Sequence, residues 1–221
     1  MIGLLATTSN PLTNYYLNAL KINSLSLLGI IYDVKGISLR DIQMIHERTG
    51  NFFQSGSEQP TDWHNDFAFI EYAPHLYSHL AEVIKLYDIK VLINIGSPRK
   101  LSMEIINAVP AGIINIHPGY LPYYRGSSAV EWSLLEGFPI TNTIHYMSKE
   151  YDEGPVIATC KVQLSPSDNY FQIRQKVHSQ SFEIVAKLVN KLLDNNFSRI
   201  DSLPQNDSIT KLRPPVDSAQ L

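Results

Sequence analysis

Hydrophobic side chains make up 44% and charged side chains 18% of the 221 residues, a composition typical of a folded globular domain rather than a disordered chain. The formal net charge of -3 argues against broad nucleic-acid binding, which depends on clustered lysine and arginine side chains. Cys160 is the only cysteine, so we expect neither an intrachain disulfide nor a cysteine-based metal cage, as in a reducing cytoplasm. The start MIGLLATTSN lacks the basic flank of a signal peptide, and no apolar run reaches the roughly 20 residues of a membrane span. These features predict a cytoplasmic protein that binds neither membrane nor nucleic acid.

Strand-like apolar runs alternate with segments of helical period through the first half of the chain. A repeated strand–helix alternation buries a parallel sheet between helices, so we expect an α/β fold with a Rossmann-like, doubly wound, mostly parallel sheet. Ligands of such sheets bind at the carboxyl ends of the strands. Strands are predicted over residues 2–6, 25–32, 91–95 and 113–117, and helices over residues 11–20, 38–48, 75–87 and 101–108.

The second half of the chain predicts a helix over residues 127–136, an antiparallel pair of strands over 141–147 and 156–164, and a long C-terminal helix over about 167–193. Residues 196–221 contain three prolines and no clear period, so we expect one catalytic domain over residues 1–195 followed by an irregular tail. The polar and aromatic residues 53–66 predict a surface loop, with substrate contact as the alternative.

A polar pair ends the fourth predicted strand. Asn115 and His117 flank Ile116, and the two-residue period of a strand directs both polar side chains to one face. Pro118 and Gly119 then end the strand. An Asn-x-His pair alone is more often a structural asparagine and a capped histidine in an ordinary turn.

The residues that follow extend this pair into a much longer pattern, which resembles the formyltransferases that use 10-formyltetrahydrofolate. The family pattern is Asn-x-His-Pro-x-x-Leu-Pro-x-Tyr-x-Gly, then Thr-x-His on a strand, then Asp-x-Gly-Pro-Val-Ile. The resemblance is firm over residues 92–157 and looser over the preceding part. The matching positions are Asn115, His117, Pro118, Leu121, Pro122, Tyr124, Gly126, Thr143, His145, Asp152, Gly154, Pro155, Val156 and Ile157.

The resemblance implies that Asn115, His117 and Asp152 form a catalytic triad. An amine that attacks a formyl carbon leaves negative charge on the oxygen and a surplus proton on the nitrogen. Asn115 can donate to that oxygen without ionising, and His117 can accept the proton or donate to the oxygen. Asp152 can orient the imidazole, stabilise its charged form or bind a proton-relaying water, although Asp-x-Gly alone is also a common turn.

No metal and no second cofactor are expected. His75 and His79 are four residues apart on a predicted helix, but no neighbouring acidic residue completes a zinc pattern. Neither a Gly-x-Gly-x-x-Gly motif nor a Walker-type lysine follows the first strand, which disfavours nicotinamide and ATP. His145 is consistent with a structural or a ligand-binding role and stays outside the catalytic set.

By resemblance, the folate cosubstrate contacts residues 97–101 and 147–151. Arg99 and Lys100 could attract the glutamate tail of the folate, with simple solvation as the alternative. The expected folate-binding residues are Ser97, Arg99, Lys100, Leu101, Met147 and Tyr151.

Family branches differ in the amine that they formylate: glycinamide ribonucleotide, methionyl-tRNA or amino-sugar nucleotides. The first branch uses a Gly-Asn-Gly-Ser-Asn loop, of which only Ser9 and Asn10 remain here, and the tRNA branch carries an RNA-binding domain for which this chain has no length. The nearest resemblance is to the small dTDP-4-amino-4,6-dideoxyglucose N-formyltransferases of surface-polysaccharide (lipopolysaccharide O-antigen) synthesis. Aromatic rings could hold sugar or base and a guanidinium could hold phosphate, although a loop that packs on itself or on a partner subunit is the alternative. The expected substrate-binding residues are Ser9, Asn10, Tyr120, Tyr123, Tyr124 and Arg125.

The sequence therefore predicts a homodimeric sugar N-formyltransferase that uses 10-formyltetrahydrofolate and a sugar nucleotide. The alternatives are a formyltetrahydrofolate hydrolase, a glycinamide ribonucleotide formyltransferase and a non-catalytic folate-binding module on the same scaffold.

Overall fold

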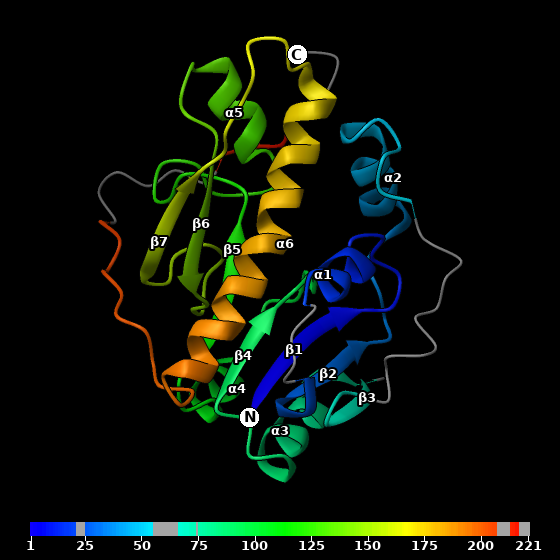
Figure 1. Ribbon diagram of the computed structural model, residues 1–221, viewed down its shortest axis with the longest axis vertical. Coiled ribbons are helices and arrows are strands. Elements are labelled where there is room, and N and C mark those ends of the chain that lie inside the picture. Colours follow the sequence, from blue (N-terminus) through cyan, green and yellow to red (C-terminus); the bar gives the residue numbers. More distant parts are fainter. Residues whose placement is uncertain (21–24, 55–65, 74, 207–212, 217–221) are drawn as a thin grey trace.

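The computed structural model describes residues 1–20, 25–54, 66–73, 75–206 and 213–216. Their strands form one sheet in the order β3-β2-β1-β4-β5-β6-β7 (Figure 1). β1 to β5 run parallel to one another, whereas β6 is antiparallel to β5 and β7 to β6. The strands are β1 (Ile2–Thr7), β2 (Leu28–Asp33), β3 (Phe69–Ala73), β4 (Val91–Asn94), β5 (Ile113–His117), β6 (Thr141–Tyr146) and β7 (Val156–Lys161).

Several helices begin at a polar residue that satisfies their first backbone N–H groups. The Ser38 and Ser102 hydroxyls accept from the third residue of α2 and α4, and Asn169 forms a reciprocal capping box with Gln172 at the start of α6. The helices are α1 (Thr13–Ala19), α2 (Leu39–Arg48), α3 (Leu76–Leu86), α4 (Met103–Ala108), α5 (Ala129–Leu135) and α6 (Tyr170–Asp194), with a 3₁₀ turn, η1, at Leu25–Leu27.

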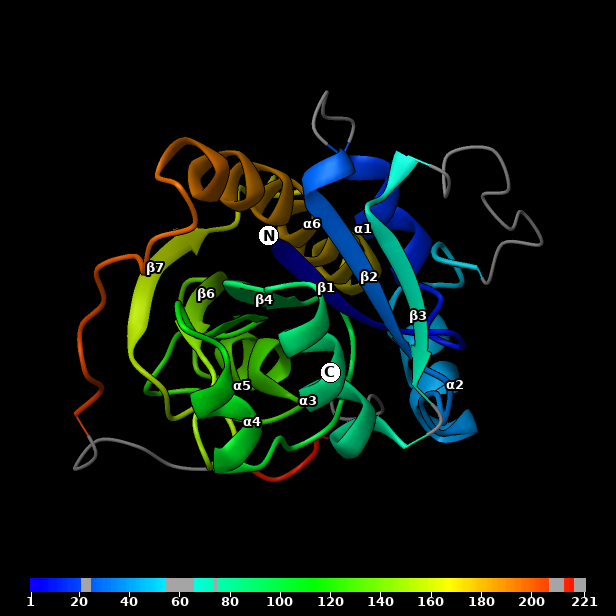
Figure 2. The same ribbon diagram turned by 90° about the horizontal axis from the view of Figure 1, so that it is seen from below.

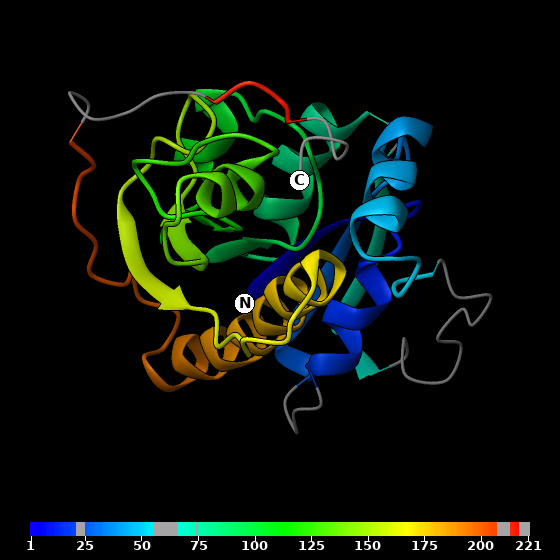
Figure 3. The same ribbon diagram turned by 90° about the horizontal axis from the view of Figure 1, so that it is seen from above.

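Helices cover both faces of the sheet. α1 and the long α6 lie on one face, and α3 and α4 on the other (Figures 2 and 3). Leu4 and Leu5 on β1 show the division, because Leu4 packs in the cluster that includes α1 and α6 and Leu5 in the cluster that includes α3 and α4. Both side chains are fully buried, as expected for a central strand of a doubly wound sheet.

The predicted fold class is confirmed, including the late antiparallel strands and the long C-terminal helix. β3 was missed because it is an edge strand that pairs only with β2, and its middle residues Ile70, Glu71 and Tyr72 are partly or fully exposed. The strand predicted over residues 25–32 begins as η1 and becomes a strand only at Leu28. Most of the loop predicted over 53–66 and much of the tail lie outside the described residues.

The described part of the tail is tied to the sheet. Leu203 and Val156 exchange two backbone hydrogen bonds, each 2.8 Å long, beside β7. Val216 is buried, and its N–H donates to the Ser128 hydroxyl at 3.0 Å. The division into a domain over 1–195 and a tail remains a prediction. Within the described ranges, no helix combines the length and apolar character needed to cross a bilayer.

Candidate active site

Asn115 is the middle residue of β5, and its carboxamide makes contacts on two sides. Its Oδ1 accepts from Asn94 Nδ2 at 3.0 Å, and its Nδ2 lies 3.1 Å from His145 Nε2. The sheet register explains both contacts, because Asn94 on β4 and His145 on β6 are the direct neighbours of Asn115. A carboxamide nitrogen carries two hydrogens, so one can serve His145 while the other is directed at a reactant.

His117, the last residue of β5, is almost fully buried. Its Nε2 lies 2.7 Å from the Tyr124 carbonyl oxygen and its Nδ1 lies 3.4 Å from Asp152 Oδ1. Both ring nitrogens therefore face protein oxygen atoms. Gly119 permits the close approach, because a Cβ there would lie 2.6 Å from His117 Nε2 and 2.7 Å from the Tyr124 oxygen.

Asp152 lies on the turn between β6 and β7, with a φ of +59°. Its Oδ2 accepts from the Gly126 N–H at 3.1 Å, while its Oδ1 lies 3.4 Å from His117 Nδ1 and 3.8 Å from His145 Nε2. The turn can approach β6 only because residue 154 is glycine, since a Cβ there would overlap the Tyr146 carbonyl oxygen. The pattern residues Gly126 and Gly154 therefore have direct roles in placing the carboxylate.

His145 joins the predicted catalytic residues into one cluster. Burial, followed by the nearby His117, lowers its pKa to about 4, so the ring is neutral near pH 7. Its Nδ1 lies 2.9 Å from the Tyr146 carbonyl oxygen and must donate there, so Nε2 accepts from Asn115. Sequence alone did not favour this role of His145 over a structural one. The available signal was the strand period, which puts Thr143 and His145 on one face of β6.

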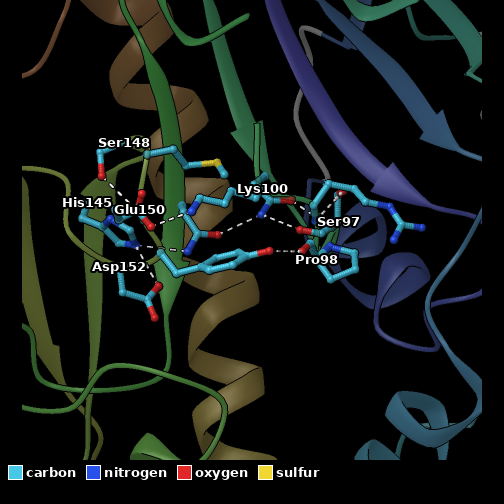
Figure 4. Close-up of a pocket in the computed structure, with 12 residues that line it drawn as sticks. Ser97, Pro98, Lys100, His145, Ser148, Glu150 and Asp152 are labelled. Carbon is cyan, nitrogen blue, oxygen red and sulfur yellow. Dashed lines mark hydrogen bonds and ion pairs between the residues drawn. The ribbon is translucent and has the colours of Figure 1, made fainter. Parts of the chain in front are cut away.

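The structure thus brings Asn115, His117 and Asp152 together, with His145 between the carboxamide and the carboxylate. Figure 4 shows His145 and Asp152 at one end of a pocket between the exits of β4 and β6. The catalytic roles of the three side chains remain predictions.

The pocket has a volume of about 170 Å³ and contains most of the residues expected to bind folate. Two contacts cross its mouth: Lys100 Nζ to Glu150 Oε2 at 2.5 Å, and the Tyr151 hydroxyl to the Pro98 carbonyl oxygen at 3.4 Å. The two predicted segments therefore form its facing walls. It is lined by Asn94, Ser97, Pro98, Arg99, Lys100, Asn115, His145, Met147, Ser148, Glu150, Tyr151 and Asp152.

Two of the expected folate residues are placed differently from the rest. The Arg99 Nε donates to Asp33 Oδ2 at 2.8 Å and a terminal nitrogen to the Gly36 carbonyl at 2.7 Å, so its guanidinium is already bound to the protein. Leu101 is not among the lining residues; its side chain is 2% exposed in the apolar cluster of α3 and α4. Lys100 is also paired, with Glu150, but both of these side chains are substantially exposed.

The residues expected to bind substrate fall into separate groups. Tyr120 and Tyr123 stack at 5.4 Å and line an open cavity of about 660 Å³ beside β7 and residues 201–206. Tyr124 is buried, and its hydroxyl donates to Glu136 at 2.8 Å. Arg125 is buried and donates to Glu153 at 2.7 Å. For Tyr124 and Arg125 these contacts favour support of the loop over contact with a ligand.

Ser9 and Asn10 form hydrogen bonds with the loops that follow β2 and β4. The Ser9 hydroxyl accepts from the Ile37 N–H at 2.8 Å, and Asn10 Nδ2 donates to the Gly96 carbonyl at 3.1 Å. Gly36 and Gly96 both have positive φ, and a Cβ at either would collide with Ser9 or Asn10. Among the residues that the structure describes, no three His, Cys, Asp or Glu side chains are grouped so as to hold a metal ion.

Sequence comparisons identify relatives that align with only part of this chain. The chain is 33% identical over 115 residues to a methionyl-tRNA formyltransferase of Desulforamulus reducens, an alignment that covers 52% of this chain and 35% of the relative. A methionyl-tRNA formyltransferase of Staphylococcus epidermidis is 27% identical over 129 residues, covering 58% of this chain and 41% of the relative. The matched segment thus spans less than half the length of these curated relatives.

Solved structures share the fold at low sequence identity. A sugar N-formyltransferase from Shewanella sp. superposes with a TM-score of 0.63 at 16% identity, covering 96% of this chain and 76% of that chain. An N-formyltransferase from Helicobacter canadensis, in complex with folinic acid and dTDP-3-aminofucose, gives 0.62 at 15% identity, covering 96% and 71%. A phosphoribosylglycinamide formyltransferase from Anaplasma phagocytophilum gives 0.61 at 18% identity, covering 93% and 94%.

The family comparison is decisive for classification. The model described as "Formyl transferase" matches residues 42–189, which is more than half of the chain and contains the Asn115, His117, His145 and Asp152 cluster. The chain therefore belongs to the formyl transferase family.

Proposed function

We propose that this protein transfers a formyl group from 10-formyltetrahydrofolate to the amino group of a nucleotide-linked amino sugar. The observation that carries the proposal is the position of Asn115, which presents a carboxamide held by Asn94 and His145 at the edge of the pocket. A preorganised neutral donor at that position suits an oxygen that becomes negative during acyl transfer.

The pocket fits the folate because it places polar side chains beside the flat or apolar surfaces of Pro98, Met147 and Tyr151. Such a mixture suits a heteroaromatic ring with donors and acceptors on its edge. When bound there, the folate supplies the formyl carbon. Of the two basic side chains of this wall, Lys100 is the better candidate for the glutamate tail, because its ion pair with Glu150 is solvent-exposed whereas Arg99 is paired with the buried Asp33 carboxylate.

Each residue of the cluster has a distinct part in the proposed chemistry. Asn115 donates one N–H to the formyl oxygen as negative charge develops, while the neutral His145 fixes the direction of the carboxamide. Asp152 lines the pocket, so its carboxylate can take up the surplus proton of the amine, and it shares that proton with His117 Nδ1, which faces it. Asn115, His117 and Asp152 are therefore assigned as the catalytic residues.

For the acceptor we favour a sugar nucleotide, with dTDP-4-amino-4,6-dideoxyglucose as the leading candidate and surface polysaccharide as its destination. The solved structures with the same fold include sugar N-formyltransferases, one of them bound to dTDP-3-aminofucose, which supports this choice. Tyr120 and Tyr123 offer stacked rings at an open cavity and are the residues that we assign to the sugar or base. A cytoplasmic homodimer is part of the same proposal.

The test is tetrahydrofolate release from 10-formyltetrahydrofolate with a panel of amines. Release that depends on an amino-sugar nucleotide supports the proposal. Release without amine would assign a hydrolase, release with glycinamide ribonucleotide a purine enzyme, and no release with any acceptor a binding module.

Asn115→Ala tests the assigned oxyanion donor. Turnover should fall about a hundredfold while folate affinity changes little, because the lost interaction forms mainly in the transition state. Asn142→Ala is the matched control: this buried carboxamide on β6 donates instead to Val177 and Gln180. The control should lose stability but keep its turnover per folded molecule. Unchanged turnover in Asn115→Ala would remove Asn115 from the mechanism.

A further inference from the structure

A short stretch of the C-terminal tail lies directly against the catalytic turn. Leu203 joins Val156 through a pair of backbone hydrogen bonds, which brings the next two residues beside the turn that carries Asp152. This stretch follows α6 and lies beyond residues 42–189, the part of the chain that the family model matches. The residues of this stretch therefore lie outside the sequence pattern from which Asn115, His117 and Asp152 were predicted to be catalytic.

Gln205 makes the closest of these contacts. Its Nε2 donates to the Asp152 carbonyl oxygen at 2.8 Å and to the Gly154 carbonyl oxygen at 2.7 Å. Both hydrogens of one carboxamide are thus used on the two carbonyls that bracket Glu153. Because Asp152 has a φ of +59°, the turn lacks the regular ladder bonds of a strand and depends on such side-chain donors.

Arg125 determines which way the Gln205 carboxamide points. The buried guanidinium donates to Gln205 Oε1 at 3.2 Å and to Glu153 Oε1 at 2.7 Å. Since arginine has donors only, the oxygen of Gln205 must face Arg125 and its nitrogen must face the turn. The pair therefore joins the loop before Gly126 to the turn of Asp152 by one defined set of bonds.

The geometry assigns Gln205 as a positioning residue of the active site, acting through the backbone of the Asp152 turn. This assignment rests on the proposed formyl transfer. The Asp152 carboxylate must accept from the Gly126 N–H while it faces His117 Nδ1, and a displacement of about 1 Å in such a site can cost on the order of a hundredfold in rate. Gln205 holds the turn that sets this position.

Gln205→Glu is the discriminating variant, because it keeps the size and the acceptor for Arg125 but removes both donors to the turn. We expect kcat to fall on the order of a hundredfold, while KM for the folate stays within about twofold. Trp132→Phe is the control: it removes a different tail contact, the 2.8 Å bond from Trp132 Nε1 to the Pro214 carbonyl, and should keep the wild-type kcat. A kcat within twofold of wild type in Gln205→Glu would overturn the assignment.

Amide hydrogen exchange provides a readout that does not need activity. The Gly126 N–H is bound to Asp152 Oδ2, so it should exchange faster in Gln205→Glu than in wild type or Trp132→Phe, with the exchange of β1 unchanged. A lower kcat with unaltered Gly126 exchange would also overturn the assignment. If the wild type transfers formyl to no acceptor, the proposed function fails, and Gly126 exchange still decides the role of Gln205.

Discussion

Strands β1 and β6 are both six residues long and both buried along their whole length, yet their sequences have opposite character. β1 reads IGLLAT and fills both helix layers with apolar side chains. β6 reads TNTIHY and buries four polar side chains in six positions. Apolar burial alone explains β1, whereas β6 is stable only if its polar groups find partners.

The described contacts give partners for three of the four polar side chains, whereas the buried Thr141 hydroxyl has none. Thr143 donates to the Gly119 carbonyl, Asn142 donates to Val177 and Gln180, and His145 contacts Asn115 and its neighbouring carbonyl. Two of these three residues tie β6 to the loop and strand that carry the predicted catalytic groups. The half of the sheet around β1 buries apolar side chains and so stabilises the fold. The half around β6 buries polar side chains that hold the predicted catalytic residues in position.

The largest expected effect is in the β6 half. Asp152→Asn keeps an acceptor for the Gly126 N–H but removes the charge that faces His117. Because an uncharged group stabilises an imidazolium poorly, turnover should fall about a thousandfold, equivalent to roughly 4 kcal/mol of transition-state stabilisation. The measurement is steady-state tetrahydrofolate release. A loss of less than tenfold would show that the carboxylate charge is not used.

The matching change in the β1 half should leave the chemistry intact. Leu4→Ala removes a fully buried side chain from the cluster beneath α1 and α6, and the resulting cavity should lower the free energy of unfolding by about 3 kcal/mol. Urea denaturation measures this loss, while turnover per folded molecule should remain that of the wild type. A stable Leu4→Ala protein with impaired turnover would contradict the division between the two halves.

Thr143→Val should affect both stability and turnover, unlike Leu4→Ala, which should affect stability alone. The hydroxyl donates to the Gly119 carbonyl at 2.6 Å and accepts from the Leu121 N–H at 3.2 Å, so valine leaves two buried backbone groups without that partner. We expect a loss of about 2 kcal/mol in unfolding free energy together with a measurable fall in turnover, because Gly119 lies against His117. Thermal melts and the release assay measure the two effects. Full activity at reduced stability would restrict Thr143 to a structural role.

The sequence predicted most elements because apolar runs and helical periods are local signals. It missed β3, whose half-exposed edge position weakens the period, and it placed η1 inside a strand. The residues Asn115, His117 and Asp152 were recognisable because their spacing follows a long pattern. Local spacing could not show that Tyr124 and Arg125 turn inward to Glu136 and Glu153.

Other site residues depend on contacts between distant segments. Asn94 meets Asn115 because β4 and β5 are neighbours in the sheet, and His145 meets Asp152 because β6 runs antiparallel to β5. Gln205 reaches Asp152 from a part of the chain whose sequence has no period at all. Such residues become visible only when the topology is known, because nothing in their own sequence neighbourhood specifies the partner.

The smallest predicted effect concerns two buried histidines, His145 on β6 and His178 on α6. Burial, followed by Arg174 and Arg48, lowers the pKa of His178 on α6 to about 3, and burial lowers that of His145 to about 4. The unfolded chain therefore binds more protons below pH 6.5, and stability falls as pH decreases from 6.5 toward these folded-state values. Between pH 7 and pH 6, each of these histidines should lower the free energy of unfolding by about 0.7 kcal/mol.

His178→Leu isolates one of these contributions, because the variant cannot take up a proton at this position in either state. Its free energy of unfolding should fall less than that of the wild type between pH 7 and pH 6, by about 0.7 kcal/mol. Urea denaturation at the two pH values measures the difference. Leu4→Ala, which lies in the β1 half and removes no titratable group, should keep the wild-type pH dependence at lower absolute stability. An identical pH dependence in His178→Leu and wild type would show that His178 does not remain neutral in the folded protein.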